Sequence, residues 1–407
     1  MNIRVLHIVS GSINDGASKG AIYLHKYLLK CGVNSKILFG SIDGRQEENI
    51  DNIYYYKKNY YEKFIYLSYK AIFKIIFNLF FSIKFIFTTG FYGVNIKKNK
   101  FFKEADVIHL HSVNDFVSLN TIKSIKKPIV WSLRDWWIMT GGVHLPNFDN
   151  SYQNKSNMKY ITMFLFKIKK KFVTNQNNIN YTAISDRIKK DFQSTYNNTK
   201  INRIYNLTDQ ESFYTTNSNN LKTSLNINTS KKILLFGAQR ISDPSKGSKY
   251  LDVILSKLDP KLYFIITFGV NDKIDLSKYN FEHVNFGEIN DNNLLRKIYS
   301  ISNLFLCTSI QESFGKTVLE SLLCSTPVVA FDIGAVNEII VHRKNGYLAK
   351  PFDIDDFIHG INFLLKIEKE WRSSEMIEKK LKYLKPFSHD VITKLHLDQY
   401  NQIINLK

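Results

Sequence analysis

Two glutamates in the C-terminal half of the chain, Glu312 and Glu320, lie eight residues apart on either side of Gly315. The apolar run 303–309 before them predicts a buried strand, and Ser325-Thr326-Pro327 ends the helix predicted after them. The pair therefore flanks a strand-to-helix turn, where free backbone N–H groups attract anions. Because carboxylates accept hydrogen bonds from hydroxyl groups, the segment fits a ligand with both phosphates and hydroxyls, such as a nucleotide sugar.

Two cations precede this segment in the sequence. The run Lys231–Gly237 predicts a strand that ends at Gly237, with Arg240 and Lys246 on the loop before the next helix. A guanidinium and an ammonium at such an edge can neutralise a diphosphate. Two loop cations alone are also explained as solvated surface charges, so the functional interpretation depends on their sharing a sheet with Glu312 and Glu320.

A glycine-containing loop follows the first predicted strand. Gly11, Gly16 and Gly20 approach two phosphate-binding patterns without satisfying either of them, because the lysine of a Walker loop and the spacing of a dinucleotide fingerprint are both missing. The loop is either a flexible strand-to-helix turn or a backbone that approaches a bound phosphate or acceptor near Gly16.

Polar residues also end two strands of the N-terminal half. His111 follows the apolar run 105–110, Arg134 and Asp135 follow 128–133, and His144 lies shortly beyond. Such residues at strand ends point to a substrate-facing rim. We expect His109 to be a core residue because it shares a strand face with apolar neighbours, and we expect His111 to be more open.

The strand and helix patterns alternate along the chain, which is typical of βαβ units and parallel sheets. A polar stretch at 206–230 interrupts this rhythm. We therefore predict an α/β protein of two doubly wound, Rossmann-like domains facing a cleft. The predicted strands are Arg4–Val9, Ser35–Phe39, Val107–Leu110, Ile129–Ser132, Tyr181–Ile184, Lys232–Phe236, Leu262–Thr267, Val284–Phe286, Leu304–Thr308 and Val328–Phe331.

The cysteine pattern and the start of the chain bear on the compartment. Three cysteines occur without a CxxC pair, and Cys307 and Cys324 have apolar neighbours, so we expect buried thiols in a reducing compartment. No cleavable signal peptide is evident, since the first ten residues resemble a strand.

The formal charge of +20 is concentrated in two lysine-rich blocks, residues 51–100 and 155–190. Nucleic acid, an anionic membrane surface and a phosphate-bearing substrate are the candidate partners. Within residues 63–87, Lys63, Lys70, Lys74 and Lys84 fall on one side of an otherwise apolar helix. This pattern favours a helix lying on a membrane surface; a core helix and a membrane span remain alternatives, and no nucleic-acid motif accompanies the charge.

From Lys231 to about Pro351 the chain resembles the retaining family 4 glycosyltransferases of the GT-B fold. The resemblance rests on the Glu-x7-Glu pair, the Lys246-Gly247 loop, the Ser325–Val329 segment and the run Asn337–Leu348. The N-terminal segments "ADVIHLH" and "WSLRDWW" followed by "TGG" are similar to a bacterial branch that builds exopolysaccharide and O-antigen chains.

The resemblance implies an N-terminal acceptor-binding domain, residues 1–205, and a C-terminal nucleotide-sugar-binding domain, residues 206–386. Residues 387–407 would form a helix that crosses back to the first domain. In that family, Glu320 would bind the ribose of the donor, and Glu312 would contact the transferred sugar beside the backbone of Phe314, Gly315 and Lys316.

The resemblance also assigns the phosphate contacts. Arg240 and Lys246 would bind the diphosphate and stabilise the leaving group, and Thr317 would add a hydroxyl. Such enzymes need no metal or other cofactor, and Asp353-Ile354-Asp355 is better explained as a helix N-cap than as a metal motif. Retention is ascribed in the family to a same-face displacement in which the departing phosphate helps to remove the acceptor proton.

The chain departs from the family at one position: Arg134 stands where a histidine is common. An arginine cannot accept a hydrogen bond, so it would recognise a carboxylate, a phosphate or another donor feature, or else the site is weakened. His144 is a candidate to substitute for the missing histidine.

The sequence therefore predicts a glycosyltransferase that moves a sugar from a nucleotide diphosphate, expected to be a UDP-sugar, to a lipid-linked acceptor. We expect it on the inner face of the cytoplasmic membrane, in surface polysaccharide synthesis, without specific binding of nucleic acid. A nucleotide-sugar epimerase of the same fold and a non-catalytic membrane- or glycan-binding relative are the alternatives.

Overall fold

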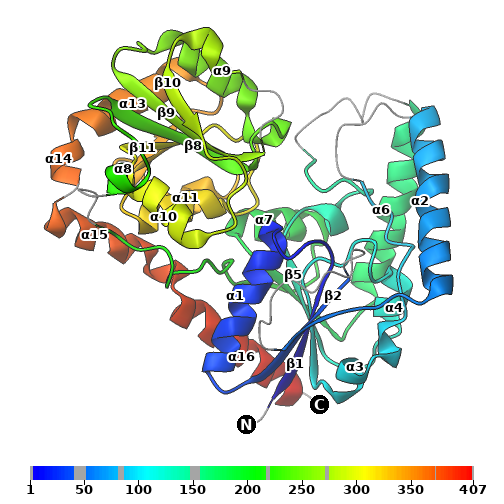
Figure 1. Cartoon of the computed structure of the whole chain (residues 1–407). Helices are drawn as coiled ribbons and strands as arrows, with labels where there is room; N and C mark the ends of the chain where they lie inside the picture. Colours follow the sequence, from blue (N-terminus) through cyan, green and yellow to red (C-terminus); the bar gives the residue numbers. More distant parts are fainter. Residues whose placement is uncertain are drawn as a thin grey trace. The chain divides into compact units, whose positions relative to one another are not determined.

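The computed structural model describes residues 3–40, 52–80, 87–146, 156–216, 221–270, 275–371 and 373–405. The chain divides into two compact units, each with strands at its centre and helices around them (Figure 1). Unit 1 comprises residues 1–207 and 392–407, and unit 2 comprises residues 208–391. This division falls within a few residues of the boundaries expected from the sequence.

Unit 1 is built on a parallel sheet with the strand order β3-β2-β1-β4-β5-β6-β7. The order reverses direction between β1 and β4, so the loops that follow these two strands open side by side at one edge of the sheet. The strands are β1 (Arg4–Val9), β2 (Asn34–Phe39), β3 (Ile53–Tyr55), β4 (Val107–Leu110), β5 (Ile129–Leu133), β6 (Ile179–Ala183) and β7 (Ile201–Arg203).

Unit 2 repeats this topology with the strand order β10-β9-β8-β11-β12-β13. Its order reverses between β8 and β11, which brings together the loops carrying the predicted cations and the predicted glutamates. The strands are β8 (Lys232–Arg240), β9 (Tyr263–Val270), β10 (Glu282–Asn285), β11 (Leu304–Cys307), β12 (Val328–Phe331) and β13 (Gly346–Ala349).

Helices connect the strands in both units. Those of unit 1 are α1 (Gly16–Lys30), α2 (Tyr60–Phe80), α3 (Lys100–Glu104), α4 (Leu119–Lys123), α6 (Ser156–Thr174) and α7 (Asp186–Thr195), with the short 3₁₀ helices η1 (Ile96–Lys98) and η2 (Trp137–Met139). Those of unit 2 are α8 (Leu221–Ser224), α9 (Ser248–Lys257), α10 (Asn292–Ile301), α11 (Lys316–Leu323), α12 (Val336–Ile339), α13 (Ile354–Lys366), α14 (Glu368–Trp371) and α15 (Ser374–Leu384), with η3 (Pro244–Lys246), η4 (Ser277–Tyr279) and η5 (Lys385–Phe387).

Helix α16 (His389–Asn405) begins in unit 2, and its residues from Ile392 onward belong to unit 1. Within unit 1 the hydroxyl of Tyr400 lies 2.6 Å from Nδ1 of His109, a residue of β4. Tyr400 is fully buried. The prediction of a C-terminal helix that returns to the first domain is therefore confirmed.

The central strands were predicted well because they are buried on both faces and consist of uninterrupted apolar runs. Three strands were missed: β3 and β7, which have three residues each and lie at the two edges of their sheet, and β13, which begins with Gly346. The prediction that the β8 strand ends at Gly237 is wrong. The strand continues to Arg240 through a register irregularity against β9, which lets it resume pairing after the glycine.

Helices α2 and α6 lie in the two lysine-rich blocks, and neither, over its described residues, meets the requirements of a membrane span. In the part of the chain that the structure describes, no helix is both long enough and apolar enough to cross a bilayer.

Candidate functional site

The glutamate segment of unit 2 forms the turn between β11 and α11. Gly315 caps the helix in the left-handed conformation, with φ of +96°. That conformation explains the glycine, because a side chain there would be strained. The first helical backbone bond runs from the N–H of Leu319 to the carbonyl of Gly315, so the N–H groups of the preceding first turn point toward the loop.

Glu312 and Lys246 meet across the β8 and β11 loops. Oε1 of Glu312 lies 2.7 Å from Nζ of Lys246 and also accepts a hydrogen bond of 2.8 Å from the Ser309 hydroxyl. Burial works to lower the pKa of Lys246, but the charge and hydrogen bond of Glu312 raise it above the ordinary lysine value. The ammonium is therefore fixed as a cation, with 29% of its side chain exposed.

A second glycine makes this approach possible. Gly247 follows Lys246 with φ of +69°, and a Cβ at that position would lie 1.8 Å from the carbonyl oxygen of Thr308. The Thr308 hydroxyl in turn donates to the carbonyl of Lys246 at 2.9 Å. The Lys246-Gly247 pair is thus held against the end of β11 by close backbone packing.

Glu320 lies within α11, and its side chain is more deeply buried than that of Glu312. Its side chain is 3% exposed, Lys316 is 3.3 Å from Oε1, and the hydroxyl of Tyr299 donates to Oε2 at 3.2 Å. Burial, followed by the charge of Glu320, raises the pKa of Tyr299 well above its usual value, so the phenol remains a donor. Each carboxylate oxygen retains a further lone pair for a ligand hydroxyl.

The remaining predicted donor-site residues lie around the same turn. Arg240 is the last residue of β8 and is exposed, while Thr317 is half-buried in the first turn of α11. Phe314 is buried and packs edge-on against Phe387, with ring centroids 6.0 Å apart. All of these residues belong to unit 2.

Sequence reasoning missed two polar partners of the glutamates. Ser309 stands three residues before Glu312, and this turn spacing could have indicated a hydroxyl-to-carboxylate bond. Tyr299 comes from α10, twenty-one residues before Glu320, and no local pattern connects the two.

In unit 1 the predicted glycine loop leads from β1 into α1. Gly11 has φ of +91°, and the backbone N–H of Ser12 donates to the Asp15 carboxylate at 2.9 Å. Gly16 opens the helix with an ordinary φ, and a Cβ there would meet nothing within 4 Å. The fold therefore does not require glycine at position 16, and a role for Gly16 in ligand binding stays a prediction.

His111 and Arg134 lie together at one edge of the unit 1 sheet, since they follow the neighbouring parallel strands β4 and β5. Nη2 of Arg134 donates to Nδ1 of His111 at 2.8 Å, and Nη1 donates to Oδ1 of Asn206 at 2.5 Å. The expectation that His111 is open is wrong, because it is only 3% exposed and stacks on His109 with ring centroids 4.0 Å apart. His109 is fully buried, as expected.

Asp135 and His144 form a separate pair. Oδ2 of Asp135 lies 2.6 Å from Nδ1 of His144, whose Nε2 is 3.0 Å from the Thr88 hydroxyl. Burial works to raise the pKa of Asp135, but the attraction and hydrogen bond of His144 and the backbone N–H of Trp137 lower it. His144 is 8% exposed and engaged on both nitrogens, so in this structure it orients Asp135. Its role as a substitute for the missing histidine stays a prediction.

The two sheets and their switch points define the class: this is the GT-B fold. Sucrose-phosphate synthase from Thermosynechococcus elongatus has a TM-score of 0.72 to this chain, with 15% identity and complete coverage of both chains. Anabaena Alr3699/HepE in complex with UDP-glucose has a TM-score of 0.69 at 15% identity, over 98% of this chain and 100% of that one.

Sequence comparisons indicate which proteins of the GT-B fold the chain is similar to. Residues 218–382 match the family model of glycosyl transferases group 1. N-acetyl-alpha-D-glucosaminyl L-malate synthase of Bacillus anthracis is 28% identical over 185 residues, and an uncharacterized glycosyltransferase of Methanocaldococcus jannaschii is 25% identical over 313 residues. These alignments cover 43% and 72% of this chain and span 47% and 75% of the relatives. Fold and matches together support a glycosyltransferase.

Proposed function

We propose that the protein is a retaining, metal-independent glycosyltransferase that takes its sugar from a nucleotide diphosphate donor bound by unit 2. The observation that carries the proposal is the pairing of Lys246 with Glu312 beside the N-terminus of α11. It places a fixed cation, a carboxylate and helix N–H groups at one sheet edge, as a diphosphate attached to a sugar requires.

The resemblance to family 4 glycosyltransferases implies the roles of the residues in unit 2. Lys246, together with Arg240, neutralises the diphosphate and stabilises it as it leaves. Glu312 binds a hydroxyl of the transferred sugar, and Glu320 accepts hydrogen bonds from the ribose. We expect the donor to be a UDP-sugar, because Anabaena Alr3699/HepE, which has a similar fold, was solved in complex with UDP-glucose.

We infer a lipid-linked acceptor on the side of unit 1. Unit 1 holds a cavity of about 710 Å³ among η2, α6 and α7. Apolar side chains such as Met163 and Phe166 line it together with the cation Lys159 and with Arg187, which Asp191 of the same lining neutralises at 2.7 Å. This mixture suits an acceptor with an apolar chain and an anionic headgroup.

Contact with an anionic membrane surface through residues 63–87 is part of the same proposal. On α2, Tyr61, Phe64 and Leu67 are between 63% and 70% exposed, and Lys63 and Lys70 are exposed as well. Large apolar side chains interspersed with lysines are typical of helices that lie in a membrane interface. The side chain of Lys74 and the whole of Lys84 fall outside the described residues.

A binding screen tests the function. A bound donor stabilises the folded state by mass action, so melting should be measured with UDP-, GDP- and ADP-sugars on the wild type and on Glu312→Ala. We expect one donor class to raise the melting temperature of the wild type and to support transfer to an acceptor. Interconversion of the free nucleotide sugar would instead indicate the epimerase, and undiminished glycan synthesis by Glu312→Ala would indicate the non-catalytic relative.

A further inference from the structure

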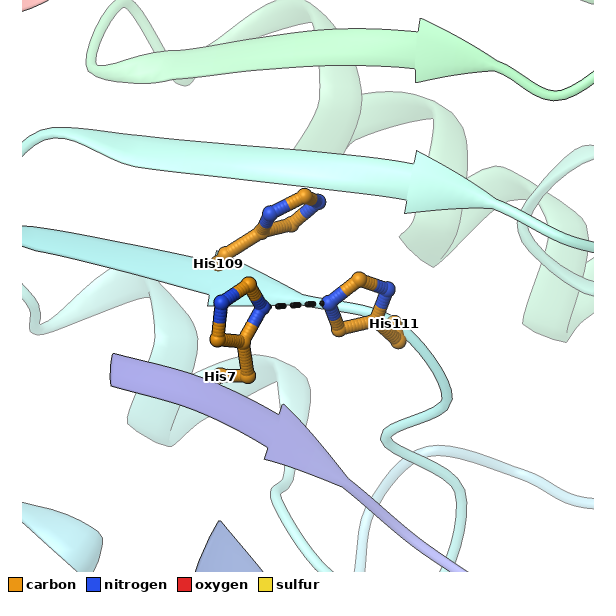
Figure 2. A group of neighbouring side chains, drawn as sticks. All are labelled: His7, His109 and His111. Atoms are coloured by element: carbon orange, nitrogen blue, oxygen red, sulfur yellow. Dashed lines mark hydrogen bonds between the residues drawn. The ribbon is translucent and has the colours of Figure 1, made fainter. Parts of the chain in front are cut away.

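Arg134 is hydrogen-bonded to His111, which belongs to a group of buried histidines in unit 1. His7 in β1, His109 in β4 and His111 just after β4 lie close together, with His7 hydrogen-bonded to His111 (Figure 2). Their ligating nitrogens are within 4.8 Å of one another, a spacing that could hold a metal ion. The surrounding hydrogen bonds decide what this group does.

The guanidinium fixes the direction of a chain of hydrogen bonds, because it can only donate. Nδ1 of His111 must therefore accept from Arg134, which places the hydrogen of the neutral ring on Nε2. That Nε2–H donates to Nδ1 of His7 at 2.8 Å, so His7 carries its own hydrogen on Nε2 and donates to Ser35 at 3.1 Å. Burial, the largest cause, lowers the pKa of His7 and His111 well below the usual value and keeps both rings neutral.

This chain of hydrogen bonds argues against a metal ion bound by the three histidines. A metal on Nε2 of His111 would require the hydrogen on Nδ1, where it would face the donating guanidinium. The guanidinium already occupies the other nitrogen, and its positive charge repels a cation nearby. The histidines act instead as neutral acceptors that orient Arg134.

Arg134 has no carboxylate to balance its charge. Its partners are His111 and Asn206, both neutral, and no ion pair to Arg134 occurs in the described parts of the chain. Burial lowers the pKa of Arg134 to about 10, with no opposing contribution from an acid. Its Nε is buried without a hydrogen-bond partner among the described residues. A partly buried guanidinium with a buried, unpaired Nε–H suits a bound anion.

A small cavity in unit 1 adjoins this guanidinium. It has a volume of about 30 Å³, room for one or two water-sized groups, and is lined by Arg134, His111 and Asn114. Asp135 lines it as well, and its carboxylate is held by Nδ1 of His144 at 2.6 Å. Ala17, in the first turn of α1, lines it too, and a helix N-terminus favours negative charge. Oδ1 of Asn114 is buried without a partner in the described structure and can accept from a hydroxyl of the same ligand.

We propose that Arg134 is a specificity-determining residue that binds an anionic group, a carboxylate or a phosphate, on the sugar or acceptor substrate, with one oxygen entering this cavity. The proposal rests on the glycosyl-transfer function, because that function supplies a substrate carrying hydroxyls beside the anion. His111 is a positioning residue that aims the guanidinium.

The experiment measures binding by calorimetry with two matched pairs of probes. UDP-glucuronate against UDP-glucose tests a carboxylate on the donor sugar, and glycerol 3-phosphate against glycerol tests an acceptor phosphate. In at least one pair we expect the wild type to bind the charged member about tenfold to a hundredfold more tightly, and Arg134→Gln to lose that preference. Equal ratios in wild type and Arg134→Gln for both pairs overturn the proposal.

Control variants separate the guanidinium from general charge and from folding. Arg203→Gln removes a guanidinium of unit 1 that Asp186 neutralises at 3.2 Å, and it should leave both preferences unchanged. His111→Asn keeps an acceptor for Arg134 and should retain most of the preference, whereas His111→Leu should reduce it. Affinity for UDP alone should not depend on Arg134. If none of UDP, GDP and ADP binds the wild type, the proposed function fails, while the glycerol 3-phosphate pair still tests Arg134.

Discussion

Each unit places a cation just after a central strand of its parallel sheet, but the two units balance its charge in different ways. In unit 2, Lys246 faces Glu312 and Lys316 faces Glu320, so each cation has a carboxylate within 3.3 Å. In unit 1, Arg134 is held by a neutral histidine and an amide. Unit 2 is therefore preorganised by ion pairs, whereas unit 1 keeps a net positive charge for a ligand to balance.

The difference also concerns protons. The ion pairs of unit 2 are stable near neutral pH, because carboxylates and lysines are both charged there. The histidine network of unit 1 is intact only while its rings are neutral. The contrast between the two units can be tested by changing pH, by removing one member of an ion pair, or by altering the surface charge of one unit.

The largest effect should come from acidification. Burial is the main cause that lowers the pKa of His7, His109 and His111 well below the usual value, and it lowers that of His396 to about 3. The unfolded chain binds protons at these residues near pH 6.5 and the folded chain does not, so stability is full above about 6.5 and is lost as pH falls below it. Four such groups give a slope of at most about 5 kcal/mol per pH unit.

Urea unfolding at pH 7.5, 6.5 and 5.5, followed by tryptophan fluorescence, measures this slope; Trp131, Trp136 and Trp137 report on unit 1. His396→Phe should reduce the slope by about one proton, since Nδ1 of His396 is buried without a partner in the described structure. Equal stability at pH 7.5 and 5.5 would show that the network tolerates charge.

Removing the cation of unit 2 should have the next largest effect. Lys246→Ala deletes the ammonium that stabilises the leaving diphosphate, and kcat should fall about a hundredfold to a thousandfold with folding retained. Steady-state transfer rates and thermal melts measure both quantities. Lys249→Ala, three residues along and exposed, is the matched control and should keep wild-type rates. A Lys246→Ala enzyme with unchanged kcat would exclude this residue from the site.

A smaller effect is expected at Glu320. Glu320→Gln removes the charge that pairs with Lys316 and retains the hydrogen bond from Tyr299, so UDP affinity should fall about tenfold, corresponding to the loss of one charge-assisted hydrogen bond. Calorimetry with UDP measures this change. Glu375→Gln removes an exposed pair of the same i,i+4 spacing to Lys379 and should be silent. Equal losses in the two variants would point to a general charge effect and not to ribose binding.

The smallest effect per residue should come from the surface of α2. Replacing Lys63, Lys70, Lys74 and Lys84 with Glu should weaken sedimentation with anionic vesicles, because each lysine near such a surface contributes about 1 kcal/mol. Vesicles of neutral lipid give the baseline. Lys344→Glu with Lys350→Glu, two exposed residues of unit 2, provides the matched control. Undiminished sedimentation of the α2 variant would refute the interfacial helix.

Prediction from sequence succeeded where information is local. Glu312, Gly315 and Glu320 stand on one strand-to-helix turn, so a single window of sequence indicated the turn and its two carboxylates. The same applies to Asp353, whose side chain caps α13 by accepting from the N–H of Asp356, as expected. The fold class followed from the alternation of buried strands and helices.

The site in unit 1 was harder to predict from the sequence, because its contacts join residues far apart in the chain. The bond from Arg134 to His111 spans 23 residues, and the bond from His111 to His7 spans 104. Taken singly, His109 was predicted to be a core residue and His111 an open rim residue, and no prediction was made for His7. Only the order of the strands brings them together, so neither the buried chain nor the burial of His111 could be inferred from spacing.

Gly20, in α1, constrains how this enzyme can change its substrate. A Cβ there would lie 2.6 Å from Nη1 of Arg134 and 2.2 Å from Oδ1 of Asn206, so even alanine would push the guanidinium out of place. Altering position 134 alone leaves empty space beside the helix, and altering position 20 alone leaves a collision. Laboratory evolution toward an uncharged substrate should therefore accept a larger residue at position 20 only after both Arg134 and Asn206 have been replaced by shorter ones. The three positions form an ordered mutational pathway that single-site libraries would fail to find.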